Sequence, residues 1–131
     1  MNYRNPTQEE QEDLRLHSLW LLDKKGKRLD WCGKDLSGID LVGTDLRFAN
    51  LYNANFHKAI LTGANLTHAH LRAANLSYAC LEDALLIKAI LSFADLSFAN
   101  LRGANLESAD LTWSNLSGAS LYNTNLVDVI I

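Results

Sequence analysis

The chain has 131 residues, which suits one domain, and its 48% hydrophobic and 21% charged residues are typical of a globular protein. A formal net charge of −3 is too small to indicate nucleic acid or a strongly basic partner. Two cysteines cannot form a disulfide framework, no apolar run is long enough to span a membrane, and the polar first 14 residues predict no secretory leader. The cytoplasm is therefore the expected location.

Residues 1–30 do not repeat and are expected to form a capping segment. Thr7 and Glu10 fit a capping box at the start of a helix from Gln8 to Lys24, which should stop near Gly26. This helix carries more apolar residues than a free helix tolerates: Leu14, Leu16, Leu19, Trp20, Leu21 and Leu22. We expect it to cover the open end of the structure that follows. A helix that docks a partner is the alternative.

From Lys34 to Ile131 one pattern recurs every five residues. A central residue, almost always Leu, follows a small residue by two positions, and Asp or Asn usually stands just before the centre. A period of five would carry the centres around an α-helix and would alternate them between the faces of a flat strand. A chain that bends once per repeat keeps both apolar positions inside, which predicts a solenoid of square-like cross-section. Leu29 and Trp31 share the spacing, so the predicted repeat domain is 31–131.

Units such as residues 64–68 (ANLTH) and 104–108 (ANLES) resemble the pentapeptide repeat family, over residues 34–131. The resemblance implies an all-β solenoid, a right-handed quadrilateral β-helix with four repeats per coil. Five coils would make a rod of roughly 24 Å. The glycines two positions after a centre predict type II turns, which need a positive φ there. Phe48, Tyr78, Phe93, Phe98 and Trp113 occupy the same position and are expected to favour another turn type.

No phosphate-binding loop, nucleophile elbow or paired-cysteine zinc spacing occurs, so no catalytic, cofactor or metal site is predicted. His57, His68 and His70 invite a metal interpretation, but solvated surface imidazoles are the favoured one. Cys32 and Cys80 lie more than two coils apart in the expected fold, beyond disulfide reach.

Apolar and aromatic residues at outward-facing positions form the candidate interaction surface. They are Ile60, Tyr78, Leu85, Ile87, Ile90, Phe93, Phe98 and Trp113. The period of twenty predicts Tyr78 over Phe98 and Phe93 over Trp113. Such columns indicate either a protein interface or a ladder that stabilises the coil, and the two interpretations weigh about equally.

The last repeats suggest an open apolar end. Leu111, Leu116, Leu121, Leu126 and Ile131 would line it, and Val129 and Ile130 replace the usual small residue and Asp or Asn. We expect a weak homodimer in which two such ends pack face to face with twofold symmetry, through Leu126, Val129, Ile130 and Ile131. A monomer whose last side chains fold over the opening is the alternative.

These patterns favour a non-enzymatic protein-interaction or scaffold protein of bacterial type. The partner is expected to be a protein, with no direct contact with nucleic acid or membrane. Some pentapeptide repeat proteins resemble duplex DNA and bind topoisomerases, so a DNA-mimicking gyrase binder is the alternative function. Residues 34–131 hold 9 acidic and 6 basic residues, and the basic ones interrupt any phosphate-like stripe.

Overall fold

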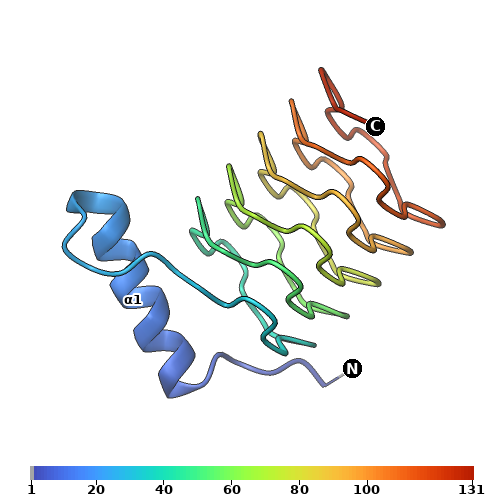
Figure 1. Cartoon of the computed structure of the whole chain (residues 1–131). Coiled ribbons are helices and arrows are strands. Elements are labelled where there is room, and N and C mark those ends of the chain that lie inside the picture. The colour runs from blue at the N-terminus through green and yellow to red at the C-terminus, as the bar shows by residue number, and fades with distance from the viewer. Residues whose placement is uncertain (1) are drawn as a thin grey trace.

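The structure is a computed structural model that describes residues 2–131, and it consists of one helix and one coil (Figure 1). Helix α1 (Gln8–Asp23) lies across the first turn of the coil, and the C-terminus lies at the opposite end. The coil is a right-handed quadrilateral β-helix, as expected. Its strands are so short that each is a single parallel bridge rather than an extended strand.

The bridges follow the repeat with a constant offset of twenty residues. Each links the residue before one centre to its equivalent one coil later, from Asp30↔Asn50 to Asp110↔Ile130. The coil therefore has four sides. Side 1 carries bridged residues 30, 50, 70, 90, 110 and 130; side 2 carries 35, 55, 75, 95 and 115; side 3 carries 40, 60, 80, 100 and 120; side 4 carries 45, 65, 85, 105 and 125. We number each corner after the side it follows.

The core consists of the two apolar positions of each repeat. The central leucines and the alanines two residues earlier are almost completely buried from Ala49 to Ala109. In this stretch each repeat places one small and one large side chain inside, which matches the regular Ala and Leu of the sequence. In the first coil Ile39 takes the small position and is also fully buried. The predicted inward orientation of both positions is thereby confirmed.

All corners have the same backbone conformation, and the expectation of a second turn type at the aromatic corners is wrong. The residue two after each centre has a positive φ from Gly33 to Asp128, with 62° at Phe48 and 58° at Trp113. The corner at Phe48 shows the cause: its N–H donates to the Thr67 carbonyl of the next coil at 3.1 Å, while Ala49 N–H closes the turn on Leu46 O at 3.1 Å. These backbone bonds outweigh the strain of the left-handed region. At Trp113, which has no coil beyond it, the bond that closes the turn, from Ser114 N–H to Leu111 O at 3.0 Å, is kept with the same conformation.

Helix α1 begins and ends as the sequence predicts, within one residue. Thr7 accepts the Glu10 backbone N–H, and the Glu10 side chain accepts the Thr7 N–H, so the capping box is confirmed. Lys24 ends the helix in the left-handed conformation. Gly26 then passes so close to the Leu16 carbonyl that a Cβ there would overlap it.

The face that α1 turns to the coil is more polar than the sequence suggested. Its buried residues are Glu10 and His17, and Leu14 packs against the core, whereas Leu22 is 81% exposed. The expectation that the leucines as a group would be buried on the first coil is thus wrong for Leu22 and for Leu19, which is 38% exposed. Specific hydrogen bonds hold much of the cap in place.

We expect truncation of an interior leucine to be costly and truncation at the open end to be cheap. Leu86 is fully buried, whereas Leu126, two levels later in the same ladder, is 43% exposed. Leu86→Ala should lower the free energy of unfolding by about 2–5 kcal/mol, because it leaves a closed cavity. Leu126→Ala should lower it by less than half as much. Urea denaturation measures both, and equal losses would contradict this account of the core.

The common corner conformation can be tested without changing any contact. A Cβ at Gly63, whose φ is 64°, would meet nothing within 4 Å. Gly63→Ala should therefore cost only backbone strain, about 1 kcal/mol after the lower entropy of the unfolded chain is counted. Ala73 has a φ of 60°, so Ala73→Gly should stabilise by a similar amount. Thermal melts of the two variants should shift in opposite directions, and shifts in one direction would refute the backbone explanation.

Candidate functional site

The outer wall is organised by a repeated side-chain hydrogen bond. Wherever Asp or Asn stands before a centre, its Oδ1 commonly accepts the backbone N–H two residues later, as Asn65 accepts from Thr67 at 3.1 Å. Several of these side chains also pair with the next coil, as Asn55 donates to Asp35 at 3.0 Å. The wall interrupts this pattern in the middle coils, at Ile60, His70, Cys80, Leu85 and Ile90, and again in the last coil, at Ser120 and Ile130.

Five of the predicted interaction residues come together around side 1. Leu85 lies on side 4, Ile87 turns corner 4, Ile90 lies on side 1, and Phe93 and Trp113 follow one another at corner 1. We call these five residues the middle-coil patch. Trp113 is 79% exposed. Phe93 and Trp113 lie on successive levels, as the period of twenty predicts. The Phe93 ring contacts the Arg72 guanidinium, which lies 5.2 Å from the ring centroid.

The remaining aromatic pair forms a second, separate feature at corner 2. The rings of Tyr78 and Phe98 stack with centroids 4.9 Å apart, as the period of twenty predicts. His57 meets Tyr78 edge-on, and Phe98 covers Gly118, where a Cβ would lie 2.6 Å from the ring. We call His57, Tyr78 and Phe98 the corner-2 column. The rings of this column pack mainly against one another, as in a ladder that stabilises the coil.

Ile60 lies apart from both groups, on side 3. The eight predicted residues therefore do not make one continuous surface. The period of twenty places each of these residues in the correct coil. Which of them are neighbours on the surface follows only from the order of the four sides.

A third ring column, which the surface prediction missed, joins α1 to the wall. Phe48 stacks on His68 at 4.9 Å, and Trp20 of α1 meets Phe48 edge-on at 6.4 Å. The spacing of twenty between Phe48 and His68 is visible in the sequence. The contact with Trp20 is not, because it depends on where the helix docks.

One hydroxyl–imidazole pair superficially resembles a catalytic arrangement. Nδ1 of His57 lies 2.8 Å from Oγ of Ser77, but that hydroxyl donates to Oδ1 of Asn75 at 2.6 Å. The imidazole therefore supplies the hydrogen in its contact with Ser77 and cannot act as the base that activates the hydroxyl. Ser77 is also buried. The contact is one more link between successive coils.

The remaining histidines and the cysteines are dispersed. His68 stands at corner 4 and His70 on side 1, away from His57 at corner 2. Within residues 2–131, no three His, Cys, Asp or Glu side chains are grouped so that they could hold a metal ion. Both cysteines are free thiols, and Sγ of Cys80 contacts Oγ1 of Thr62 at 3.2 Å.

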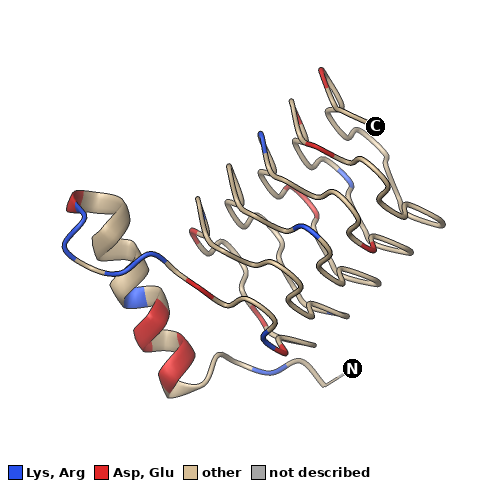
Figure 2. Cartoon of the chain, in the orientation of Figure 1, with Lys and Arg blue, Asp and Glu red and all other residues tan. Residues whose placement is uncertain are grey.

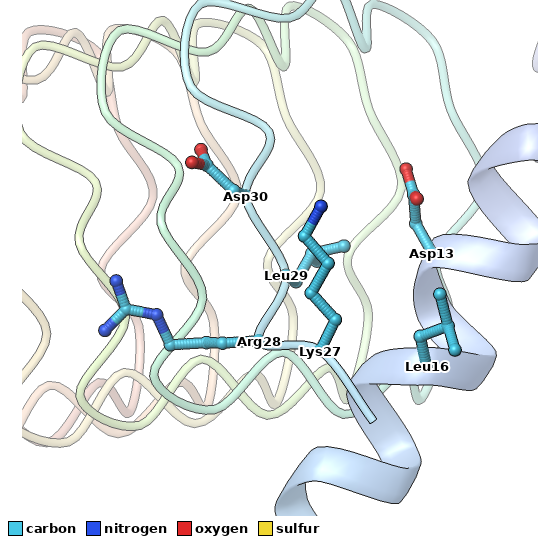
Figure 3. Close-up of a pocket in the computed structure, with 6 residues that line it drawn as sticks. All are labelled: Asp13, Leu16, Lys27, Arg28, Leu29 and Asp30. Atoms are coloured by element: carbon cyan, nitrogen blue, oxygen red, sulfur yellow. The ribbon is translucent and has the colours of Figure 1, made fainter. Parts of the chain in front are cut away.

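Several hollows adjoin the N-terminal segment, and one of them lies between Leu21 of α1 and Arg47 of the first coil. A recess of about 40 Å³ lies between α1 and the segment that follows it, with room for about one water molecule. In Figure 3 the Arg28 side chain points along the coil, away from α1. A further hollow, about 340 Å³, is an open groove at corner 2 beside Lys58 and Tyr3.

Acidic and basic side chains are separated from each other in the cap and interspersed along the wall of the coil. Figure 2 shows acidic residues gathered in the first turns of α1 and basic residues in the turn that follows it, which suits the helix dipole. Along the coil, acidic and basic positions are interspersed. The wall therefore lacks the continuous acidic stripe of a duplex mimic in the part of the chain described, residues 2–131.

The lower edge of the coil is covered by the N-terminal segment. Arg4 forms a parallel bridge with Ile39, and its guanidinium donates to the Asp35 carbonyl at 3.3 Å. The same guanidinium holds Glu10 through two hydrogen bonds of 2.8 and 3.0 Å. Asp13 accepts the indole N–H of Trp31 at 2.9 Å. These contacts tie α1 to the first coil and occupy backbone groups that would otherwise be exposed at an edge.

The upper edge is open. Leu121 and Leu126 are more than a third exposed, and Ile131 is 91% exposed. In the coil below, the N–H of Leu101 donates to Ser120 O and the N–H of Leu106 to Asn125 O. The corresponding N–H groups of Leu121 and Leu126 have no such backbone partner within residues 2–131. This end combines an apolar centre with unpaired backbone donors.

No helix in the described residues is long and apolar enough to cross a membrane. The family model described as pentapeptide repeats matches the chain at residues 35–67, 49–86 and 89–128, with 8 copies of the repeat. No curated protein matches the chain significantly.

Solved structures of several proteins resemble the chain. The cyanobacterial Rfr23 protein of Cyanothece 51142, a pentapeptide repeat protein, is 31% identical over 89% of this chain and 94% of its own, with a TM-score of 0.68. A pentapeptide repeat protein from the thylakoid lumen of Arabidopsis thaliana is 33% identical over 79% of this chain and 68% of its own, with a TM-score of 0.59. HetL of Nostoc sp. strain PCC 7120, involved in heterocyst differentiation regulation, is 31% identical over 79% of this chain, with a TM-score of 0.57. The chain spans only 54% of HetL.

The ion pair under the cap predicts a loss of stability in strong acid. The hydrogen bond from Arg4, aided by that from the Thr7 backbone, lowers the pKa of Glu10 to about 2, although burial acts in the opposite direction. Because the pKa is depressed in the folded state, the contribution of Glu10 is complete above about pH 4.5 and is lost as the pH falls toward 2. Glu10→Gln should lower stability at pH 7 and flatten this part of the pH profile. Glu12→Gln, which changes an exposed carboxylate on the same helix, is the control. A profile in Glu10→Gln that keeps the full acid loss would contradict the assignment.

Proposed function

Because the chain belongs to the pentapeptide repeat family, we propose that it is a non-enzymatic protein-interaction module of the cytoplasm whose middle-coil patch binds a protein partner. In this proposal, residues 1–30 form the capping segment and residues 31–131 the interaction domain. The regulatory role given for HetL supports a regulatory rather than a metabolic task for the module.

The observation that carries the proposal is where the wall departs from its own pattern. Leu85 and Ile90, in consecutive repeats, replace the Asp or Asn that accepts a backbone N–H in most other repeats, which gives up a hydrogen bond worth about 1 kcal/mol. Trp113 stands 79% exposed, and its ring stacks on no other ring among residues 2–131. Leu85 is 37% exposed, and Ile87 and Ile90 are half-buried. Exposed tryptophan is the residue type most typical of a protein-binding hot spot.

Substitution of the patch should separate binding from stability. We expect the triple variant Leu85→Ser, Ile87→Ser, Ile90→Ser to lose a partner captured from the native host while its melting temperature changes little. The same partner, purified, should bind the wild type and not the variant in calorimetry. Tyr78→Ser with Phe98→Ser is the matched control, because it disrupts a ladder and should lower the melting temperature. A large melting shift in the triple variant, with binding retained, would refute the proposal.

The open upper edge supports a second association, between two copies of the chain. We propose a weak homodimer in which Leu126, Val129, Ile130 and Ile131 of each copy pack face to face. Sedimentation equilibrium should give a concentration-dependent dimer, and Val129→Lys with Ile131→Lys should give a monomer. A wild type that stays monomeric at high concentration, or a dimeric double variant, would refute this association.

The alternative function, a DNA-mimicking gyrase binder, draws its support from the excess of acidic over basic residues in the coil. It predicts that micromolar protein reduces supercoiling by gyrase. The interspersed basic side chains on the wall favour the interaction module instead.

A further inference from the structure

We propose that His17 makes the cap acid-labile, so that protonation of its ring releases α1 from the first coil while the remaining coils stay folded. The N-terminal edge would then be covered at neutral pH and open in mild acid. This inference does not depend on which partner the wall binds.

The ring of His17 is held in its neutral form by its surroundings. It is completely buried, and Nδ1 accepts the backbone N–H of Leu29 at 3.0 Å. Its hydrogen is therefore on Nε2, which has no hydrogen-bond partner among the described residues. The ring also stacks on Trp20, with centroids 5.8 Å apart and planes at 10°.

A second proton would have to be placed on Nδ1, where it would point at the Leu29 N–H. Two donors cannot share that contact, so the hydrogen bond that joins α1 to the first coil would be lost. The buried site would also acquire a charge, whose desolvation outweighs the favourable effects of the Arg47 backbone and Asp45. Protonation and docking of the helix are thus mutually exclusive.

The charged groups around the site do not rescue the protonated ring. Asp45 of the first coil favours it, but this carboxylate is already held by Arg47 at 2.7 Å. Arg47 and Arg28 oppose the charge, although the Arg47 backbone favours it, and Lys24 on α1 lies over the Trp20 ring at 3.6 Å. Burial is the largest effect and lowers the pKa of His17 below its ordinary value.

Release should be local because the cap and the coil are held by different forces. The cap is held by a small number of contacts. The polar ones include Arg4–Glu10, Asp13–Trp31 and His17–Leu29, and the apolar ones include Leu14 against the core and Trp20 against Phe48. Each coil beyond the first is held by backbone hydrogen bonds on all four sides and by buried leucines. Loss of the helix leaves those intact.

Hydrogen exchange of the full chain tests the proposal residue by residue. A released imidazole titrates near pH 6.5, so docking is fully stable above that pH and weakens as the pH falls below it. Between pH 7.5 and pH 5, after correction for intrinsic exchange rates, protection of the Leu29 and α1 amides should fall by up to about thirtyfold. Protection of the Leu66 and Leu86 amides should not change. A constant Leu29 protection, or a parallel loss at Leu66 and Leu86, would overturn the proposal.

Two variants identify the titrating group. His17→Asn retains an acceptor for the Leu29 N–H without a titratable ring, and it should remove the change between pH 7.5 and pH 5. If its cap is undocked at pH 7.5, His17→Gln replaces it. His70→Asn, on the exposed side 1, is the matched control and should keep the full pH dependence. A His17 variant with a docked cap and an unchanged pH dependence would also overturn the proposal.

Discussion

The whole fold depends on a backbone constraint: at each corner from Gly33 to Ser108, a left-handed residue also donates its N–H to the next coil. The turn is closed by one bond within the repeat, as from Ala49 to Leu46, and is fixed by another to the coil above. Once these bonds are made, the corner residue itself hardly matters, so Phe, Lys, Asp and Gly all occupy it with φ between 55° and 72°. Strain at each corner is distributed and compensated rather than concentrated at one site.

The two ends of the coil differ in whether other residues of the chain cover their backbone groups. The lower end is closed by Arg4, which continues the bridging pattern, and by α1, which covers the first coil. Among residues 2–131 nothing covers the upper end, which presents the same backbone pattern, so the interactions that build each coil are available there to another surface. Because the cap is attached through Glu10, Asp13 and His17, it is also the part of the molecule most responsive to charge.

The repeated part of the structure could be predicted from the sequence because the same five-residue pattern recurs in every repeat. Spacing of Ala and Leu alone placed the core, and the period of twenty placed Tyr78 over Phe98. Local preference predicts the wrong turn at Phe48 because it takes no account of the backbone bond to Thr67. The burial of His17 was missed because it occurs once, and its partner, the Leu29 N–H, is a backbone group that carries no side-chain signal. The grouping of Leu85 with Trp113 required the four-sided geometry.

The inner and outer positions of each repeat are under different constraints, and this difference favours the outer wall as the functional surface. The inner positions and the backbone bonds already determine the coil, so outward side chains are free to vary at small cost to stability. Most repeats nevertheless have Asp or Asn before the centre. The side chain of this residue accepts a backbone N–H of the turn, and the hydrogen bond stabilises the corner. Its loss at Leu85 and Ile90 therefore marks repeats where another demand outweighed local stability. Apolar contact with a second protein would supply that demand, since burial of the two side chains in an interface returns more free energy than the hydrogen bonds given up.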